Sequence, residues 1–313
     1  MGAGGRKVAV ILLVWCVCGF GSGGDGGNPA AEEADLSSVS LNWLPENPKQ
    51  GEVVRLSLQG PEEMRVRGAE AQSRALAFYP ALERPGHWES LYGIDAEQEP
   101  GEVEITVFLD LPGPREPGVV RGRVGIGKRV FAEERLTLPD RMVHLGARDL
   151  ERVRKEEEVI SALWLVHTPE RVWNGPFAMP LQGRRGSPFG LRRWINGEPR
   201  SFHTGMDVKA AEGAPVRAAH AGRVVLTGDF FFGGKSVFLD HGQGLYTMYF
   251  HLSGVRVKPA ESVGQGEVVG WVGQTGRASG PHLHWGARLA GARVDPLSLI
   301  ESTQDPLPVA EAR

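Results

Sequence analysis

Short valine-rich runs separated by glycine constrain the last third of this 313-residue chain more than any other feature. Helical periodicity is absent there, which favours β-strands over helices. Glycine reaches the positive φ angles that tight turns need, so a glycine between two runs marks a turn. The pattern predicts an antiparallel β-sheet domain with a groove over residues 181–300. The runs are 216–219, 223–226, 235–239, 245–250 and 267–272, and the punctuating glycines are Gly222, Gly228, Gly242, Gly244, Gly264, Gly266 and Gly273.

Residues 38–140 have a different pattern, in which runs of alternating apolar and polar residues are separated by Pro- and Gly-rich turns. The runs 52–58, 75–79 and 103–109 are typical of a small antiparallel β-sandwich. No residue type in this region points to catalysis, and we expect His87, which follows Pro85 and Gly86, to serve a turn or packing role. The whole chain is therefore expected to be mainly β.

A helix is predicted between these two units. Apolar residues recur at helical spacing from Leu150 to Val166, through a charged run at 152–158 that we read as the solvated face. We expect residues 141–180 to form a helical linker and residues 301–313 a C-terminal tail.

The N-terminus has the composition of an export signal. Arg6 and Lys7 precede an apolar run at 8–17, and small residues follow. Residues 1–24 are expected to be a signal peptide or, alternatively, an N-terminal membrane anchor, although the run is shorter than the ~20 residues that span a bilayer. A lipid-modified cysteine is a further alternative, because both cysteines, Cys16 and Cys18, lie in this segment. Residues 25–37 are Gly-, Ala- and acid-rich and are expected to form a flexible tether.

Charge is unevenly distributed although the net charge is only −3. Residues 181–300 hold 14 Lys and Arg against 8 Asp and Glu, whereas residues 25–180 hold 18 against 27. A basic C-terminal half would be attracted to a polyanionic matrix such as a cell wall, and a mixed solvated surface is the alternative. Nucleic acid is not an expected partner, because the basic residues are scattered and no stacking platform accompanies them.

Five polar residues in the C-terminal unit have the spacing of a hydrolytic zinc site: His203, Asp207, His251, His282 and His284. His203 and Asp207 are four residues apart, and His282 and His284 flank one leucine, so both imidazoles face one side of a strand. Zinc binds nitrogen and carboxylate oxygen tetrahedrally, and a catalytic site uses three protein ligands so that water occupies the fourth position. A lone histidine is more often structural, as expected for His144, His167 and His220.

The residue types also indicate what such a site does. No cysteine is available for a structural site, and bound zinc lowers the pKa of its water towards 7. The chain has no His-Glu-x-x-His motif, so a spare histidine, with a reference pKa of about 6.5, is the natural general base. Activity is then expected to fall below about pH 6.5.

These motifs resemble those of the lysostaphin-type peptidoglycan metallo-endopeptidases. The likeness covers roughly 185–297 and rests on segments 202–208, 240–242, 249–253 and 276–285. The resemblance implies that His203, Asp207 and His284 bind Zn²⁺, and that His251 and His282 are the catalytic, non-ligating pair. His282 is the preferred candidate for activating water and His251 for stabilising the oxyanion. The resemblance further suggests structural support for His241 and a groove-facing position for Arg192.

The resemblance implies hydrolysis of peptide cross-links or stem peptides of bacterial peptidoglycan. It also implies an exported protein of the periplasm or cell envelope, with a possible membrane tether through the N-terminal segment, and an immunoglobulin-like character for the sandwich at 38–140. The alternatives are a non-catalytic relative that binds the wall or activates another hydrolase, and a transporter-associated β domain of related shape. No sequence feature indicates an oligomeric state.

Overall fold

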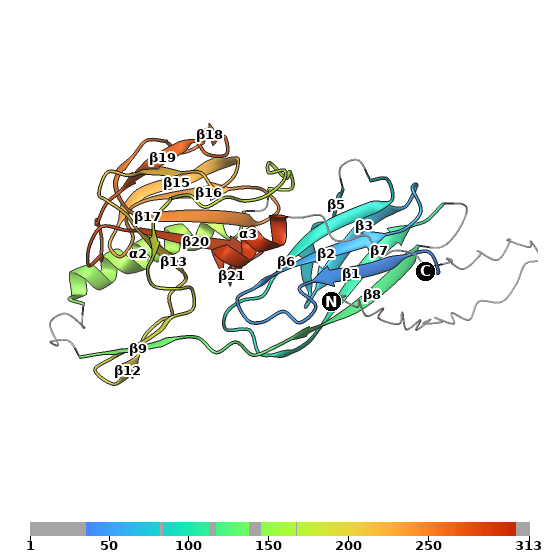
Figure 1. The fold of residues 1–313 in the computed structure, drawn as a ribbon, viewed down its shortest axis with the longest axis horizontal. Coiled ribbons are helices and arrows are strands. Elements are labelled where there is room, and N and C mark those ends of the chain that lie inside the picture. Colours follow the sequence, from blue (N-terminus) through green and yellow to red (C-terminus); the bar gives the residue numbers. More distant parts are fainter. Residues whose placement is uncertain (1–35, 82–83, 113–116, 138–144, 167, 305–313) are drawn as a thin grey trace, which may run out of the picture.

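The computed structural model describes residues 36–81, 84–112, 117–137, 145–166 and 168–304 (Figure 1). The predicted signal, nearly all of the predicted tether, His144 and His167 lie outside the described residues. At the end of the tether, Leu36 packs against the sandwich core and its carbonyl accepts a hydrogen bond from Val39, so ordered structure begins before residue 38. Among the described residues, every helix falls short of the length and apolarity needed to cross a membrane.

The N-terminal part contains two four-stranded antiparallel sheets around one core. Strand β2 places Val54, Leu56 and Leu58 in this core, and β7 from the other sheet contributes Ile105 and Val107. Alternation along both strands accounts for this arrangement, because residues two apart share a face. The predicted β-sandwich is confirmed, and its immunoglobulin-like character stays a prediction. One sheet has the order β1 (Ser40–Leu44), β2 (Val53–Gln59), β6 (His87–Gly93), β5 (Tyr79–Pro80), and the other β4 (Arg74–Leu76), β3 (Arg65–Ala71), β7 (Gly101–Asp110), β8 (Gly118–Ile126).

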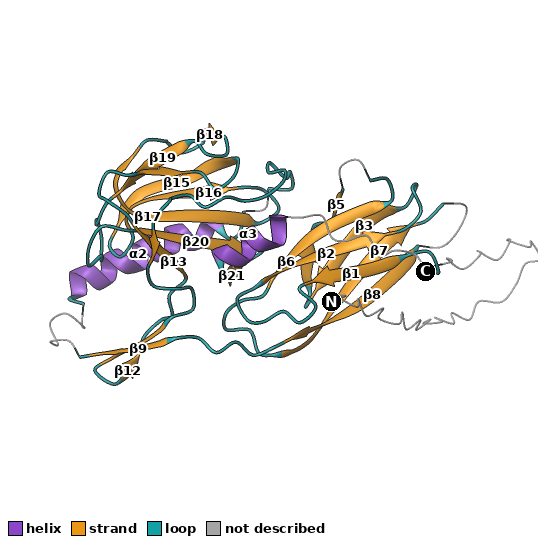
Figure 2. Ribbon diagram, viewed as in Figure 1, coloured by secondary structure: helices purple, strands orange, loops and turns teal. Residues whose placement is uncertain are grey.

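The C-terminal part is built on one ten-stranded sheet (Figure 2). Its neighbouring strands β13, β20 and β17 pair antiparallel and carry Asp207, His284 and His251. His203 and His282 lie just before β13 and β20. The main path is β10 (Arg184–Arg185), β13 (Gly205–Lys209), β20 (Leu283–Leu289), β17 (Leu245–Val255), β16 (Gly234–Asp240), β15 (Gly222–Phe230), β18 (Ser262–Val263), and β14 (Pro215–Arg217), β19 (Val268–Val272) and β21 (Ala292–Val294) pair beside it. The predicted antiparallel sheet is confirmed.

The two faces of this sheet have different coverings. Leu283, Trp285 and Ala287 of β20 point into the main core, so the intervening His284 points to the opposite face. On that opposite face a smaller cluster of Phe230, Phe238, Tyr246 and Met248 is covered by helix α2 (Ala147–Leu163). The helix therefore lies on the sheet rather than bridging free space. Its charged run is not only solvated, because Glu156 accepts a hydrogen bond from the Phe231 amide at 2.7 Å.

A third, small sheet joins the two parts in a way the sequence did not indicate. Strand β9 (Glu133–Leu136), which follows the sandwich, pairs parallel with β11 (Arg192–Ile195) of the C-terminal part, and β11 pairs with β12 (Glu198–Pro199). The predicted sandwich range of 38–140 therefore includes β9, a strand that pairs with the β11–β12 hairpin and not with the sandwich sheets.

Helix α3 (Pro296–Gln304) packs the C-terminal part onto the sandwich. Asp295 caps the helix, because its carboxylate accepts the Leu297 amide hydrogen at 3.1 Å. Val53 of β2 donates its N–H to the Ser298 hydroxyl at 2.9 Å and accepts a hydrogen bond from the Ser302 hydroxyl at 2.7 Å. The helix runs four residues past the predicted boundary at 300, so the predicted tail begins too early.

Replacing Leu299 tests this interface. Its side chain is 0% exposed inside the core that joins the sandwich to the main sheet, so Leu299→Ala should reduce the free energy of unfolding by roughly 2–5 kcal/mol. Leu150→Ala on α2, where the side chain is 54% exposed, is the control and should change it by no more than about 0.5 kcal/mol. Urea unfolding followed by circular dichroism measures both, and equal effects would contradict the assignment of Leu299 to this core.

Candidate metal centre

Strand pairing brings the first two candidate ligands together. Asp207 of β13 lies directly opposite His284 of β20, and both point away from the main core. The neighbouring pair is Gly205 opposite Gly286, which leaves room beside the imidazole. A methyl group on Gly205 would lie 2.8 Å from His284 Nε2 and closer still to the Trp285 carbonyl oxygen. Glycine is therefore required at 205 for the imidazole to lie flat against this strand.

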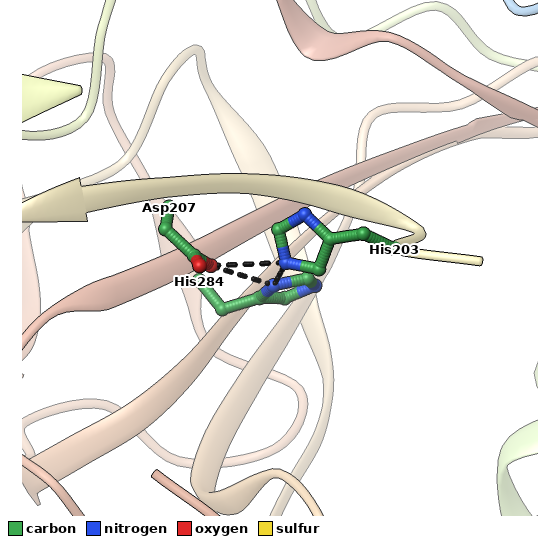
Figure 3. A group of neighbouring side chains, drawn as sticks. All are labelled: His203, Asp207 and His284. Carbon is green, nitrogen blue, oxygen red and sulfur yellow. Dashed lines mark hydrogen bonds and ion pairs between the residues drawn. The ribbon is translucent and has the colours of Figure 1, made fainter. Parts of the chain in front are cut away.

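His203, just before β13, completes a compact set of donor atoms (Figure 3). Its Nε2 lies 3.0 Å from Asp207 Oδ1 and 2.7 Å from His284 Nδ1, and the latter lies 3.1 Å from the same carboxylate oxygen. Ligands about 2.0–2.2 Å from one tetrahedral zinc ion lie roughly 3.3 Å apart. Two imidazole nitrogens and one carboxylate oxygen, nearly at that separation, fit a single zinc ion.

The protonation state of the set also suits a cation. Burial alone would raise the pKa of Asp207, but the imidazoles of His203 and His284 beside it hold that pKa well below its usual value, so the carboxylate is charged. Burial lowers the pKa of His284 to about 4, so its imidazole is neutral at pH 7. His203 Nδ1 lies 2.8 Å from the Pro188 carbonyl oxygen, which requires the proton on Nδ1 and leaves the Nε2 lone pair facing the carboxylate.

His251 and His282 lie beside this set. The two rings are 4.7 Å apart between centroids, His251 is 6.1 Å from the His284 ring, and His282 Nε2 lies 3.8 Å from Asp207 Oδ1. Each donates Nδ1–H to a backbone carbonyl, His251 to Thr275 at 2.9 Å and His282 to Gly280 at 2.8 Å. In the neutral imidazole these bonds leave the lone pair on Nε2. The structure brings all five predicted site residues together.

The position of His251 depends on an irregularity in β17. The register with β16 shifts between Lys235 and Val237, and His251 has a φ of 62°, in the left-handed region. Its N–H donates to the Gly233 carbonyl at 2.7 Å, and its ring is anchored to Thr275. A bulge that re-aims one side chain is common beside active sites, and a non-glycine residue in this conformation is strained. Tyr249-Phe250-His251-Leu252 carries no residue type that would signal this bulge.

Several supporting groups were not predicted. The carbonyls of Pro188, Thr275 and Gly280 orient three histidines, and backbone carbonyls carry no signal in side-chain identity. The Thr275 hydroxyl donates to the Leu252 carbonyl at 2.7 Å and accepts the Lys235 amide hydrogen at 2.9 Å, which ties its loop to both strands around the bulge. The sequence feature that could have pointed to Thr275 is its position between Gly273 and Gly276.

The remaining candidates lie elsewhere. His241 is fully buried: Nδ1 donates to the Ala221 carbonyl at 2.7 Å and Nε2 accepts from the Thr247 hydroxyl at 2.8 Å. His220 bonds to the Asn174 carbonyl, and His87, half-buried at the start of β6, bonds to the Pro85 carbonyl. The Arg192 guanidinium lies 5.8 Å from the centre of the Phe131 ring. Structural roles fit the three histidines, while the groove and the groove-facing role of Arg192 stay predictions.

Comparison with known proteins agrees with this geometry. The model of Peptidase family M23 matches residues 201–296. A crystal structure of a putative peptidase M23 from Pseudomonas aeruginosa is 32% identical, with a TM-score of 0.63, over 82% of this chain and 96% of that one. The chain belongs to peptidase family M23. The predicted resemblance to the lysostaphin-type peptidases is thereby confirmed.

Curated relatives of this M23 chain match over less than half of its length. The DD-carboxypeptidase/endopeptidase Mpg of Neisseria meningitidis serogroup B is 40% identical over 39% of this chain and 28% of its own length. The peptidoglycan DD-endopeptidase ShyA of Vibrio cholerae is 38% identical over 30% and 22%. Lysostaphin of Staphylococcus staphylolyticus is 33% identical over 47% and 26%. The aligned region thus spans about a quarter of each curated relative.

The strain at His251 predicts an unusual order of stabilities. In the metal-free protein, His251→Gly should be more stable than His251→Ala by about 1 kcal/mol, because glycine adopts the φ of 62° without steric cost. At Arg223, an exposed position in β15, the same two substitutions should give the opposite order. Urea unfolding of the four variants tests this, and an alanine variant at least as stable at 251 would show that the backbone there is unstrained.

Burial of His241 predicts a dependence of stability on pH. Burial lowers its pKa from 6.5 to about 4, so the unfolded chain takes up a proton in this pH window before the folded chain does. Its contribution is complete above pH 6.5 and is lost progressively down to about pH 4, by up to about 1.4 kcal/mol per pH unit. His241→Asn, which keeps a donor near the Ala221 carbonyl, should therefore have a flatter profile. Unfolding of both proteins between pH 4.5 and 8 measures the slopes, and identical slopes would contradict the assignment.

Proposed function

We propose that this M23 chain is a zinc-dependent endopeptidase that hydrolyses peptide cross-links or stem peptides of bacterial peptidoglycan. The observation that carries the proposal is the convergence of His203 Nε2, Asp207 Oδ1 and His284 Nδ1 within 3.1 Å of one another, with two further histidines alongside. The names of the relatives Mpg, ShyA and lysostaphin support the substrate class.

The metal role falls to His203, Asp207 and His284. An all-cysteine set would indicate a structural zinc site, whereas two imidazoles and one carboxylate are typical of a catalytic zinc site, and the carboxylate neutralises one of the two charges of the ion. When bound, zinc polarises a carbonyl oxygen and lowers the pKa of water to about 7. The Pro188 carbonyl supports this role, because it fixes the proton on the far nitrogen of His203.

His251 and His282 supply proton transfer in this proposal. Burial lowers the pKa of His251, so at neutral pH its imidazole is uncharged and its Nε2 can accept a proton or a hydrogen bond. The carbonyls of Thr275 and Gly280 hold the two rings by Nδ1, so each presents the same nitrogen to a bound peptide. His282 remains our candidate for activating water. His251 remains the candidate for stabilising the developing negative charge, a role that requires a proton on its Nε2.

The proposal includes the location and organisation predicted above. The protein would be exported to the periplasm or cell envelope through residues 1–24, which would either be removed or tether it to the membrane. The sandwich at 38–140 would accompany a peptidase unit at 181–300. A wall substrate agrees with both, since it lies outside the cytoplasm and its peptides carry negative charge that the basic C-terminal half would attract.

Ligand and non-ligand histidines should separate on mutation. His284→Ala and His203→Ala should abolish both zinc retention and release of peptides from purified sacculi, because each removes one of three ligands. His282→Ala should retain zinc and lose activity by about 100-fold or more, the usual scale for a general acid–base residue. Elemental analysis and mass spectrometry of the released fragments are the two measurements.

His87→Ala is the control, because His87 is the first residue of β6 in the sandwich and does not belong to the histidine cluster. It should match the parent in zinc content and activity. Undiminished hydrolysis by protein stripped of metal would refute the proposed reaction. A parent that retains zinc and binds sacculi without releasing fragments would instead identify a non-catalytic wall-binding protein.

A further inference from the structure

His203 is held in place by the segment that precedes the β11–β12 hairpin. Its Nδ1–H donates to the Pro188 carbonyl at 2.8 Å, its N–H donates to the Leu191 carbonyl at 2.9 Å, and its carbonyl accepts the Gly190 N–H at 2.8 Å. Side chain and backbone are thus both fixed by residues 188–191. Whatever positions this segment also positions the first candidate metal ligand.

The N-terminal sandwich packs directly on this segment. Phe189 is 3% exposed, and a methyl group added to Gly51, in the turn before β2, would lie 2.5 Å from its ring. On the next residue, a methyl group added to Gly190 would collide with the ring of Phe131, which belongs to the connection between β8 and β9. Segment 188–191 therefore packs closely against the turn at Gly51 and against the ring of Phe131.

Three phenylalanines form what we call the aromatic column: Phe131, Phe189 and Phe202. Ring centroids are 6.3 Å apart from Phe131 to Phe189 and 6.1 Å from Phe189 to Phe202, in edge-to-face geometry. Phe202 is the residue immediately before His203. The column therefore runs from a residue of the sandwich connection to the backbone of the metal ligand.

Arg293 covers the Phe202 end of the column and ties it to the sandwich. Its guanidinium lies 4.6 Å from the centre of the Phe202 ring. It also forms a two-pronged ion pair with Asp95, with Nε 2.9 Å from Oδ2 and Nη2 2.7 Å from Oδ1, and its backbone N–H donates to Oδ2 at 2.8 Å. Asp95 directly follows Ile94, which is fully buried in the sandwich core. Bidentate pairing of this kind fixes the plane of a guanidinium.

We propose that Asp95 and Arg293 are positioning residues for the metal centre: the sandwich, through this ion pair and the aromatic column, holds Phe202 and His203 in the orientation that binds zinc. This inference rests on the proposed function, since it assigns a metal role to His203. It gives the N-terminal part a task in the geometry of the metal centre. Loss of the Asp95 carboxylate removes this two-pronged contact and leaves the guanidinium with Glu97, whose Oε2 lies 2.7 Å from Nη2 but whose side chain is 61% exposed. One exposed partner does not fix the plane of the guanidinium, so Arg293 then no longer holds Phe202 in one place.

Glu89 offers a matched control for Asp95. Both are sandwich carboxylates paired with arginine, and their side chains are 12% and 19% exposed. Glu89 pairs with Arg55 at 2.6 Å and Arg84 at 3.2 Å, and neither arginine belongs to the aromatic column or covers it. Replacing Glu89 removes a similar ion pair from the same domain without releasing Phe202, so it reports the effect of general destabilisation.

The experiment compares the full chain with its Asp95→Asn and Glu89→Gln variants. Zinc affinity is measured by competition with a chromophoric chelator. Hydrogen exchange of the segment containing the His203 amide is measured on the metal-free proteins, and thermal unfolding reports stability. Asp95→Asn should weaken zinc binding by about tenfold or more, the scale found when groups that orient a ligand are removed. It should also accelerate exchange around His203, whereas Glu89→Gln should change neither at a comparable loss of thermal stability.

The outcomes separate this inference from the function on which it rests. Zinc affinity of Asp95→Asn within twofold of the parent, or an equal loss in Glu89→Gln, would overturn the positioning role while leaving the metal centre intact. A parent chain that binds no zinc would overturn the proposed function itself. Arg293→Lys gives a second test, because lysine keeps the charge but lacks the planar fork, and it should fall on the side of Asp95→Asn.

Discussion

The antiparallel pairing of β13 with β20 is the interaction on which the site depends. It sets Asp207 opposite His284, and the alternation of the same two strands sends Met206, Val208, Leu283 and Trp285 into the main core. A shift of one residue in this register would bury the carboxylate and imidazole and expose the apolar side chains. Burial of those four side chains, each worth about 1.5–3 kcal/mol, therefore stabilises the ligand geometry without any direct contact with metal.

The site combines groups that would be costly to bury separately. A carboxylate and four imidazoles lie close together, and the protein compensates with hydrogen bonds rather than countercharges: the carbonyls of Pro188, Thr275 and Gly280 each accept an Nδ1–H. These bonds also choose the tautomers. His284 presents Nδ1 to the carboxylate because it lies on β20, directly opposite Asp207. His203 presents Nε2 instead, because it lies just before the start of β13. Local backbone geometry thus decides which ring nitrogen each histidine offers.

Much of this could be read from the sequence, for identifiable reasons. Period-two alternation predicted the mainly β fold, and the spacing of His203 with Asp207 and of His282 with His284 predicted one compact cluster. The parallel pairing of β9 with β11 could not be predicted, because about 60 residues separate them and both strands are short and polar. The bulge at His251 could not be predicted, because it depends on hydrogen bonds to Gly233 and Thr275, which lie in other segments of the chain. The helix α2 was expected, but its packing on the sheet through the contact of Trp164 with Tyr246 could not be predicted, because that contact depends on the tertiary fold.

Strand β9 has a consequence for how this protein can be recombined. After the sandwich, the chain forms β9, which pairs with β11 of the hairpin that precedes His203. It then continues into α2 and the main sheet. A cut between the apparent domains, whether made by a protease or by a cloning boundary, therefore leaves a strand of one fragment paired within the other. A replacement sandwich would preserve the architecture only when the junction is placed after Leu136, so that the donated module brings its own strand to the hairpin.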